Sequence, residues 1–269
     1  MIPAVISLVL VGFLFGGLLA LAGQKFAVEE DPRIEEISEL LSGANCGACG
    51  YAGCRGFAEA VVAGRADTAG CPVNSSEVDA QIAGILGLEV SHREPLLARV
   101  YCQGSSDVSQ DKSVYQGIET CAAAAQVSGG GHKACADGCL GLGSCRDACP
   151  FHAISIVDGL AVIDPKLCTG CGKCVQSCPK GLIALASRAS TVHVLCKNTD
   201  RGASVRKYCK VGCIGCRACV KVCPVAAVTV DDNLAKIDYD LCISCGACVE
   251  KCPPKCIVEE RSHQAQAAS

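Results

Sequence analysis

The sequence predicts an α+β protein with an apolar N-terminal transmembrane helix, a small helical domain and two tandem copies of a cysteine-rich module. Three observations lead to this fold class. Cysteine accounts for 25 of the 269 residues. The cysteine spacing of Cys149–Cys178 recurs in Cys223–Cys252, 74 positions later, so the chain contains an internal repeat. Residues 2–22 carry no charged side chain.

The N-terminal segment favours a membrane anchor over residues 1–25. Residues 2–22 are almost entirely apolar, and at about 1.5 Å per residue such a helix is just long enough to span a bilayer. A signal peptide would need a basic start, which is missing, although Ala20–Ala22 resembles a cleavage site. Lys25 and Arg33 follow the helix. The positive-inside rule therefore predicts a single pass through the cell membrane, with the soluble body on the cytoplasmic side.

Residues 26–90 predict a small helical domain. Asp31-Pro32 starts one helix, and a cap at Ser75 or Ser76 starts another that ends at Gly87. Four thiols lie in the segment between the two helices, which predicts a self-contained [4Fe–4S] site. A zinc site with four thiolates is the alternative. The motif is C-x2-C-x4-C-x16-C-P, formed by Cys46, Cys49, Cys54 and Cys71.

Three later runs have the pattern C-x2-C-x2-C-x3-C-P, which is typical of bacterial ferredoxins that bind two [4Fe–4S] clusters. In this pattern three closely spaced cysteines bind one cluster, and the cysteine before proline binds the other. Zinc sites instead use separated C-x2-C pairs, often with histidine, so the pattern favours iron–sulfur clusters over zinc. The runs are Cys168–Pro179, Cys213–Pro224 and Cys242–Pro253.

The segments that join the runs repeat as well. Residues 153–164 align with residues 227–238, and each alternates apolar and polar side chains around a turn with Asp158-Gly159 or Asp232-Asn233. Such a pattern predicts a β-hairpin. We therefore expect two tandem double-cluster modules, over residues 91–188 and 189–260, and a disordered polar tail over residues 261–269.

The ferredoxin rule assigns ligands in both modules. The second module has Cys213, Cys216, Cys219 and Cys252 for one cluster, and Cys223, Cys242, Cys245 and Cys248 for its neighbour. The first module has Cys149, Cys168, Cys171 and Cys174 for one cluster, and Cys135, Cys139, Cys145 and Cys178 for the other. The last set departs from the pattern, because Leu142 stands where a cysteine is expected and Cys135 aligns with Cys209, not with Cys216.

Each module begins with a leader that carries two more cysteines. Strands are predicted over residues 97–101 and 191–195, and each leads into a cysteine that is followed by a polar loop and a second, isolated cysteine. We hypothesise that these four thiols bind a sixth cluster beside the five assigned above; the alternatives are four ordinary buried thiols or an exchange of roles between Cys209 and Cys216. The four are Cys102, Cys121, Cys196 and Cys209, and only Cys256 is then left over.

The residues predict an electron carrier without bond chemistry of its own. Rossmann, nucleophile-elbow, flavin and nicotinamide motifs are absent, and a net charge of −3 gives no sign of nucleic-acid binding. Thiolate ligands call for a reducing compartment. Basic side chains near the cluster loops predict either a solvated face or a docking patch for an acidic soluble electron carrier. They are Lys133, Arg146, Lys173, Lys180, Arg188, Arg206, Lys207, Lys210, Arg217 and Lys221.

The order of these motifs resembles the B subunit of the Rnf complex. The resemblance rests on NCGACGYAGC after an apolar helix, then the tandem runs, and GCLGLGSC and YCKVGCIGCRACVKVCP resemble the long, clostridial-type form. It implies a [4Fe–4S] subunit of an ion-translocating ferredoxin:NAD+ oxidoreductase in the cytoplasmic membrane. Soluble ferredoxin would be the electron donor, and a flavin-bearing subunit and other membrane subunits would be partners. Alternatives are a polyferredoxin subunit of another membrane oxidoreductase, such as a hydrogenase, and a non-redox scaffold stabilised by metal.

Overall fold

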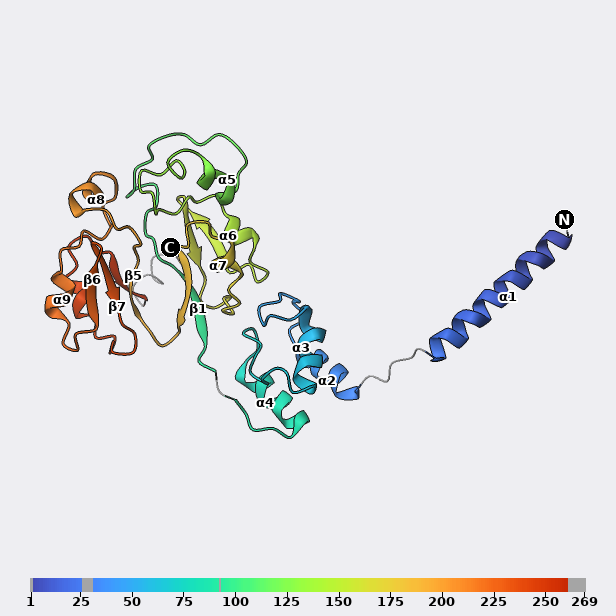
Figure 1. Cartoon of the computed structure of the whole chain (residues 1–269). Helices are drawn as coiled ribbons and strands as arrows, with labels where there is room; N and C mark the ends of the chain where they lie inside the picture. The colour runs from blue at the N-terminus through green and yellow to red at the C-terminus, as the bar shows by residue number, and fades with distance from the viewer. Residues whose placement is uncertain (1, 26–30, 92, 261–269) are drawn as a thin grey trace.

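The computed structural model describes residues 2–25, 31–91 and 93–260 and has mixed α and β structure. The predicted disordered tail over residues 261–269 lies outside the described residues. Figure 1 shows three parts in chain order: an isolated N-terminal helix, a small helical domain, and two modules with paired strands that lie against each other.

Helix α1 (Ile2–Lys25) forms over the segment predicted as a membrane anchor. Several of its large apolar side chains are exposed, among them Leu10, Phe13 and Leu19. In the part of the chain that the structure describes, however, no helix has both the length and the apolar character required to cross a membrane. The structure therefore does not show the predicted single-pass anchor.

The small helical domain contains three helices, α2 (Pro32–Leu40), α3 (Gly53–Val62) and α4 (Ser76–Leu86). The side chain of Asp31 caps α2 by accepting the N–H of Arg33 at 3.0 Å, and Ser75 caps α4. Gly87 ends α4 in the left-handed conformation, with φ of 64°. The helices share one core, centred on Ile37, Phe57 and Ile82.

Each module contains the hairpin that the repeat predicts. Strand β2 (Ile154–Val157) pairs with β3 (Leu160–Ile163), and β6 (Val228–Asp231) pairs with β7 (Leu234–Ile237), all antiparallel. The two hairpins lie 74 positions apart, as expected. Their turn residues have positive φ, which two-residue hairpin turns require. Both predicted hairpins are therefore confirmed.

The leader strands close the modules. Strand β1 (Leu96–Val100) pairs with β4 (Ile183–Ser187), and β5 (Val192–Val194) pairs with β8 (Ile257–Glu259). Each leader strand thus pairs with the strand that follows the last Cys-Pro of its own module. The predicted leader strands are confirmed to within one residue at each end.

Short helices make up the rest of the regular secondary structure described in the two modules. They are α5 (Cys121–Gln126), α6 (Ser144–Asp147), α7 (Lys173–Ser177), α8 (Gly202–Tyr208), α9 (Ala218–Val222) and α10 (Ala247–Glu250). Helices α6, α7, α9 and α10 each follow a residue in the left-handed conformation. Each of these four helices carries one buried cysteine, so the tight turn before it fixes where that thiol points.

The two modules are joined by backbone and side-chain contacts. The N–H of Gln110 donates to the carbonyl of Tyr208 at 2.8 Å, and the N–H of Lys210 donates to the carbonyl of Val108 at 2.9 Å. Arg99, which is only 7% exposed, forms an ion pair with Glu260 at 2.5 Å. The loop after β1 is therefore held against the segment that follows α8.

His193 on β5 is buried at the same boundary, with 1% of its surface exposed. Its Nε2 lies 2.8 Å from the carbonyl of Ser190, and its Nδ1 lies 2.6 Å from the hydroxyl of Tyr239. Because a carbonyl only accepts, Nε2 carries the hydrogen, and Nδ1 of the neutral ring accepts from Tyr239. Burial lowers the pKa of His193, and the nearby Arg99 lowers it further.

This environment predicts an acid-sensitive module boundary. Because the folded-state pKa of His193 lies below its ordinary value of about 6.5, the neutral ring stabilises the fold fully above that pH and progressively less as the pH falls below it. We expect His193→Phe to lower the melting temperature at pH 7.5 but to flatten its fall between about pH 7.5 and 5.5, measured anaerobically. His152→Asn, at an exposed position, is the control. An unchanged pH slope in His193→Phe would contradict the prediction.

Candidate iron–sulfur sites

All 25 cysteines are free thiols. The structure brings all of them except Cys256 into six groups of four, which we number as sets 1 to 6 in their order through the molecule. Set 1 contains Cys46, Cys49, Cys54 and Cys71; set 2 contains Cys149, Cys168, Cys171 and Cys174; set 3 contains Cys121, Cys139, Cys145 and Cys178. Set 4 contains Cys102, Cys135, Cys196 and Cys209; set 5 contains Cys213, Cys216, Cys219 and Cys252; set 6 contains Cys223, Cys242, Cys245 and Cys248.

Set 1 is held by the small helical domain. Burial raises the pKa of the Cys71 thiol, and the neighbouring Cys49 and Cys46 raise it further. The side-chain oxygen of Asn45 accepts the N–H of Cys54 at 2.9 Å, at the start of α3. A Cβ on Gly53 would lie 2.6 Å from that oxygen. Only glycine fits there, so it permits the turn that brings the third thiol to the set.

Sets 2 and 6 are equivalent in the two modules and follow the ferredoxin spacing. The third thiol of each C-x2-C-x2-C segment is buried in a short helix, Cys174 in α7 and Cys248 in α10. Burial raises the pKa of Cys174 to about 12 and that of Cys248 to about 11. The sulfur of Cys223 accepts the N–H of Ala227 at 3.3 Å. The structure therefore groups these eight thiols as the sequence predicts.

Set 5 surrounds one pocket together with a fifth cysteine, Cys256, which is 1% exposed. Its Sγ lies 3.6 Å from the Sγ of Cys252, and it also hydrogen-bonds to Cys213, which lowers the pKa of Cys213 to about 6. The equivalent position of the first module is Leu182, which is equally buried. Cys256 is thus a fifth thiol within hydrogen-bonding distance of the set, at a place where the other module has an alkyl side chain.

Set 3 contains Cys121, which the spacing pattern had placed with the leader thiols. The N–H of Cys121 donates to the hydroxyl of Ser144 at 2.8 Å, and this bond fixes the start of α5 beside α6. Cys121 then shares a pocket with Cys139, Cys145 and Cys178. By the repeat of 74 positions, Leu142 is equivalent to Cys216. Cys121 therefore supplies the thiol that Leu142 lacks.

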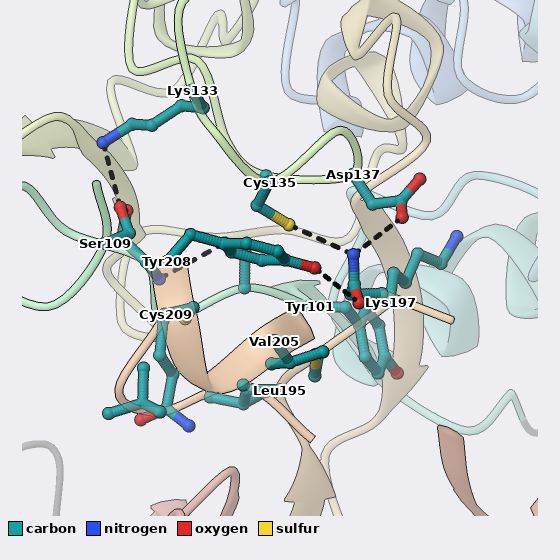
Figure 2. A pocket seen from close by; sticks show the side chains of 18 residues that line it. Tyr101, Ser109, Lys133, Cys135, Asp137, Leu195, Lys197, Val205, Tyr208 and Cys209 are labelled. Atoms are coloured by element: carbon teal, nitrogen blue, oxygen red, sulfur yellow. Dashed lines mark hydrogen bonds between the residues drawn. The ribbon is translucent and has the colours of Figure 1, made fainter. Parts of the chain in front are cut away.

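Set 4 contains Cys135 in place of Cys121 (Figure 2). Cys135 lies 74 positions before Cys209, and Cys102 lies 94 positions before Cys196. The set therefore consists of two equivalent pairs, one from each module. The sequence contained one signal of this, because Cys135 aligns with Cys209. The longer first leader obscured the equivalence of Cys102 and Cys196. In the structure, Cys121 and Cys135 therefore occupy each other's predicted sets.

The thiol environments fit [4Fe–4S] clusters. Burial raises the pKa of Cys135 to about 12 and that of Cys145 to about 11, so a group of thiolates is unfavourable there until cationic iron compensates their charge. Among the described residues no three Cys, His, Asp or Glu side chains converge on a single metal ion. Backbone N–H groups point at sulfur, from Gly104 to Cys102 at 3.3 Å and from Leu182 to Cys178 at 3.4 Å. Such N–H···S bonds are the usual surroundings of cluster ligands.

Consecutive sets lie close enough for their thiols to interact electrostatically or by a hydrogen bond. Cys46 of set 1 raises the pKa of Cys171 of set 2. Cys145 of set 3 raises the pKa of Cys174 of set 2. Cys102 of set 4 raises the pKa of Cys139 of set 3. The sulfur of Cys196 in set 4 accepts the N–H of Cys213 in set 5 at 3.4 Å. Cys219 of set 5 acts on the pKa of Cys248 of set 6. The six sets therefore form one series, with set 4 at the boundary of the modules.

Three family models match the chain. Residues 41–73 match a putative Fe-S cluster model, residues 161–184 a 4Fe-4S binding domain, and residues 206–253 a 4Fe-4S dicluster domain. The matched parts thus include set 1 and the regular runs of both modules. The irregular Cys135–Cys145 block, where Leu142 interrupts the spacing, lies outside these matches.

Similar proteins cover most of the chain. It is 44% identical over 85% of its length to the B subunit of the Na+-translocating ferredoxin:NAD+ oxidoreductase complex of Acetobacterium woodii, covering 69% of that protein. It is 43% identical over 85% to the B subunit of the ion-translocating oxidoreductase complex of Methanosarcina acetivorans, covering 87%, and 40% identical over 89% to the proton-translocating counterpart of Clostridium ljungdahlii, covering 85%. With its cluster-binding domains and these relatives, the chain belongs to the family of Rnf complex B subunits, the iron–sulfur electron-transfer subunits of ion-translocating ferredoxin:NAD+ oxidoreductases.

Proposed function

We propose that this protein carries electrons through six [4Fe–4S] clusters, one in each of sets 1 to 6, from reduced ferredoxin toward the flavin-bearing, NAD+-reducing part of its complex. Bound clusters of this type supply one-electron redox chemistry. The observation that carries the proposal is the unbroken series of neighbouring thiol sets. A series of closely spaced sites is what electron transfer across a long polypeptide requires.

Set 4 decides whether the series is continuous. Without a cluster there, sets 1 to 3 and sets 5 and 6 would form two separate groups. Cys102 and Cys135 come from the first module, and Cys196 and Cys209 come from the second. The same four thiols would therefore connect the two modules both electronically and mechanically.

We further propose that ferredoxin docks on the second module. Cys216 of set 5 and Cys245 of set 6 are the two exposed thiols among the 25. Ile243 beside Cys245 is 62% exposed, and Leu241 is 53% exposed. An apolar contact beside positive charge suits an acidic electron carrier. The cations exposed around the set 5 loop are Arg206, Lys207, Lys210, Arg217 and Lys221.

One residue of the predicted basic patch does not belong to any exposed surface. Lys133 is only 3% exposed, and its Nζ lies 3.2 Å from the hydroxyl of Ser109 and 3.5 Å from a carboxylate oxygen of Asp111. The ammonium group of Lys133 therefore interacts with Ser109 and Asp111 inside the fold and is not available to a docking partner. The docking proposal rests on the cations of the second module alone.

The membrane attachment is proposed for α1. Its exposed apolar side chains, together with the membership of the complex, support attachment to the cell membrane through this helix, with the cluster-bearing body on the cytoplasmic side. Set 1 lies in the domain that directly follows α1 in the chain. Electrons that enter at set 6 would therefore leave near the membrane.

The ligand sets can be tested by removing set 4. We expect about 24 irons per chain in the anaerobically purified protein and about 20 in Cys102→Ala/Cys196→Ala. After alkylation of the native variant, mass spectrometry should find Cys135 and Cys209 modified and Cys121 protected. Cys256→Leu, which copies the first module, should keep all the iron. Labelling of Cys121 instead of Cys135 would contradict the grouping, and unchanged iron would contradict the sixth cluster.

Docking on the second module predicts a charge effect on ferredoxin oxidation. We expect Arg217→Glu/Lys221→Glu to slow electron transfer from reduced ferredoxin about tenfold at low ionic strength, because electrostatic steering accelerates encounters by that order or more. The difference should shrink as salt screens the charges. Arg65→Glu/Lys166→Glu makes the same change in net charge at exposed positions elsewhere. Equal slowing in this control, measured by stopped flow, would place the docking surface elsewhere.

If α1 attaches the protein to the membrane, removing α1 should move the protein from the membrane fraction to the soluble fraction. The chain starting at residue 31, expressed in a host without the other proteins of the complex, should move from the membrane pellet to the supernatant and keep its full iron content. A truncated chain that stays in the pellet would show that another surface binds the membrane.

A further inference from the structure

Asn198 is a buried amide beside set 4, with 3% of its surface exposed. Its Nδ2 lies 3.4 Å from the sulfur of Cys135 and 3.2 Å from Oδ2 of Asp137. Figure 2 shows three of the residues around this amide, Cys135, Asp137 and Tyr208, with dashed lines for their hydrogen bonds. The side chain thus donates directly to a sulfur of the set that joins the modules.

The orientation of this amide is fixed by its other end. Its Oδ1 lies 3.0 Å from the backbone nitrogen of Asp200 and 3.2 Å from the hydroxyl of Tyr208. The backbone N–H of Asp200 can only donate, whereas the single hydroxyl hydrogen of Tyr208 also has Oδ2 of Asp200 within reach, at 2.5 Å. The acceptor oxygen of Asn198 therefore faces the N–H of Asp200, and the NH2 group faces Cys135 and Asp137. A flipped amide would set NH2 against the N–H of Asp200. The donor is therefore held in place before any cluster binds.

The contact crosses the module boundary and breaks the internal symmetry. By the offset of 94 positions that relates Cys102 to Cys196, Asn198 is equivalent to Gly104. The backbone N–H of Gly104 donates to Cys102 at 3.3 Å, and the backbone of Asn198 makes the matching bond to Cys196. The side chain is an addition that only the second module supplies, and it reaches the first module's Cys135.

We infer that Asn198 is a positioning residue that raises the reduction potential of the cluster in set 4 through its N–H···S hydrogen bond to Cys135, an inference that rests on the proposed cluster in that set. Hydrogen bonds to the ligand sulfurs stabilise the reduced cluster, which carries one more negative charge. In the buried setting around Asn198, water competes little for the donor, so the effect of the bond is large. Electrons are thereby favoured at the one site shared by both modules.

The test is a set of redox titrations on the full-length, anaerobically purified protein. Asn198→Ala removes the donor without adding charge. Asn198→Asp keeps the shape and an acceptor oxygen for the N–H of Asp200 but replaces NH2 by oxygen. Asn233→Asp is the matched control, because its amide donates to the carbonyl of Thr199 at 3.0 Å and to no cysteine. The wild-type titration curve should contain one reduction step that is absent from the curve of Cys102→Ala/Cys196→Ala. That step is assigned to the cluster in set 4.

We expect Asn198→Ala to lower the equilibrium constant for reduction of the cluster in set 4 about tenfold. For a one-electron step this is a shift of the reduction potential by about 59 mV in the negative direction. Asn198→Asp should shift it further, with full iron content, while the other steps and Asn233→Asp stay at their wild-type potentials. A set 4 step at the wild-type potential in both Asn198 variants would overturn the inference and leave the series intact. Full iron and no missing step in Cys102→Ala/Cys196→Ala would overturn the proposed cluster as well.

Discussion

The fold depends on one electrostatic constraint: buried thiols must be placed in groups, and a group of buried thiolates is unstable alone. Burial raises the pKa of Cys135, Cys174 and Cys248 well above that of a free thiol, and neighbouring thiolates raise it further. The apolar cores of both modules are themselves rich in cysteine, and aromatic side chains make up only 4% of the sequence. Cationic iron would remove both difficulties, so folding and cluster binding are coupled.

The regular part of this arrangement could be predicted from sequence because spacing and structure agree there. A repeat of 74 positions located both hairpins, and strands were predicted directly before Cys102 and Cys196. Set 1 and sets 2, 5 and 6 follow motifs in which all ligands, or three of four, lie within one short segment. Local spacing contains the necessary information in those cases.

The irregular part could not be predicted from spacing, because it depends on contacts between distant segments. Leu142 leaves the first module one thiol short, and nothing local shows that α5 returns through Ser144 to supply Cys121. The longer first leader also shifts the offset from 74 to 94 positions, which hides the equivalence of Cys102 and Cys196. Lys133 was grouped with surface cations for the same reason, since its burial depends on residues more than twenty positions earlier in the chain.

Duplication explains why the two modules can share a site. When two copies of a fold pack with their equivalent edges together, a thiol pair in one copy meets the matching pair in the other, and Cys102 with Cys135 meets Cys196 with Cys209. In a fully symmetric site, the two modules would give equivalent sulfurs the same hydrogen bonds. Substitutions in one copy alone, Asn198 against Gly104 and Cys256 against Leu182, give equivalent sulfurs different hydrogen bonds. Since such bonds set potentials, these substitutions are how a duplicated series of clusters acquires sites of unequal potential.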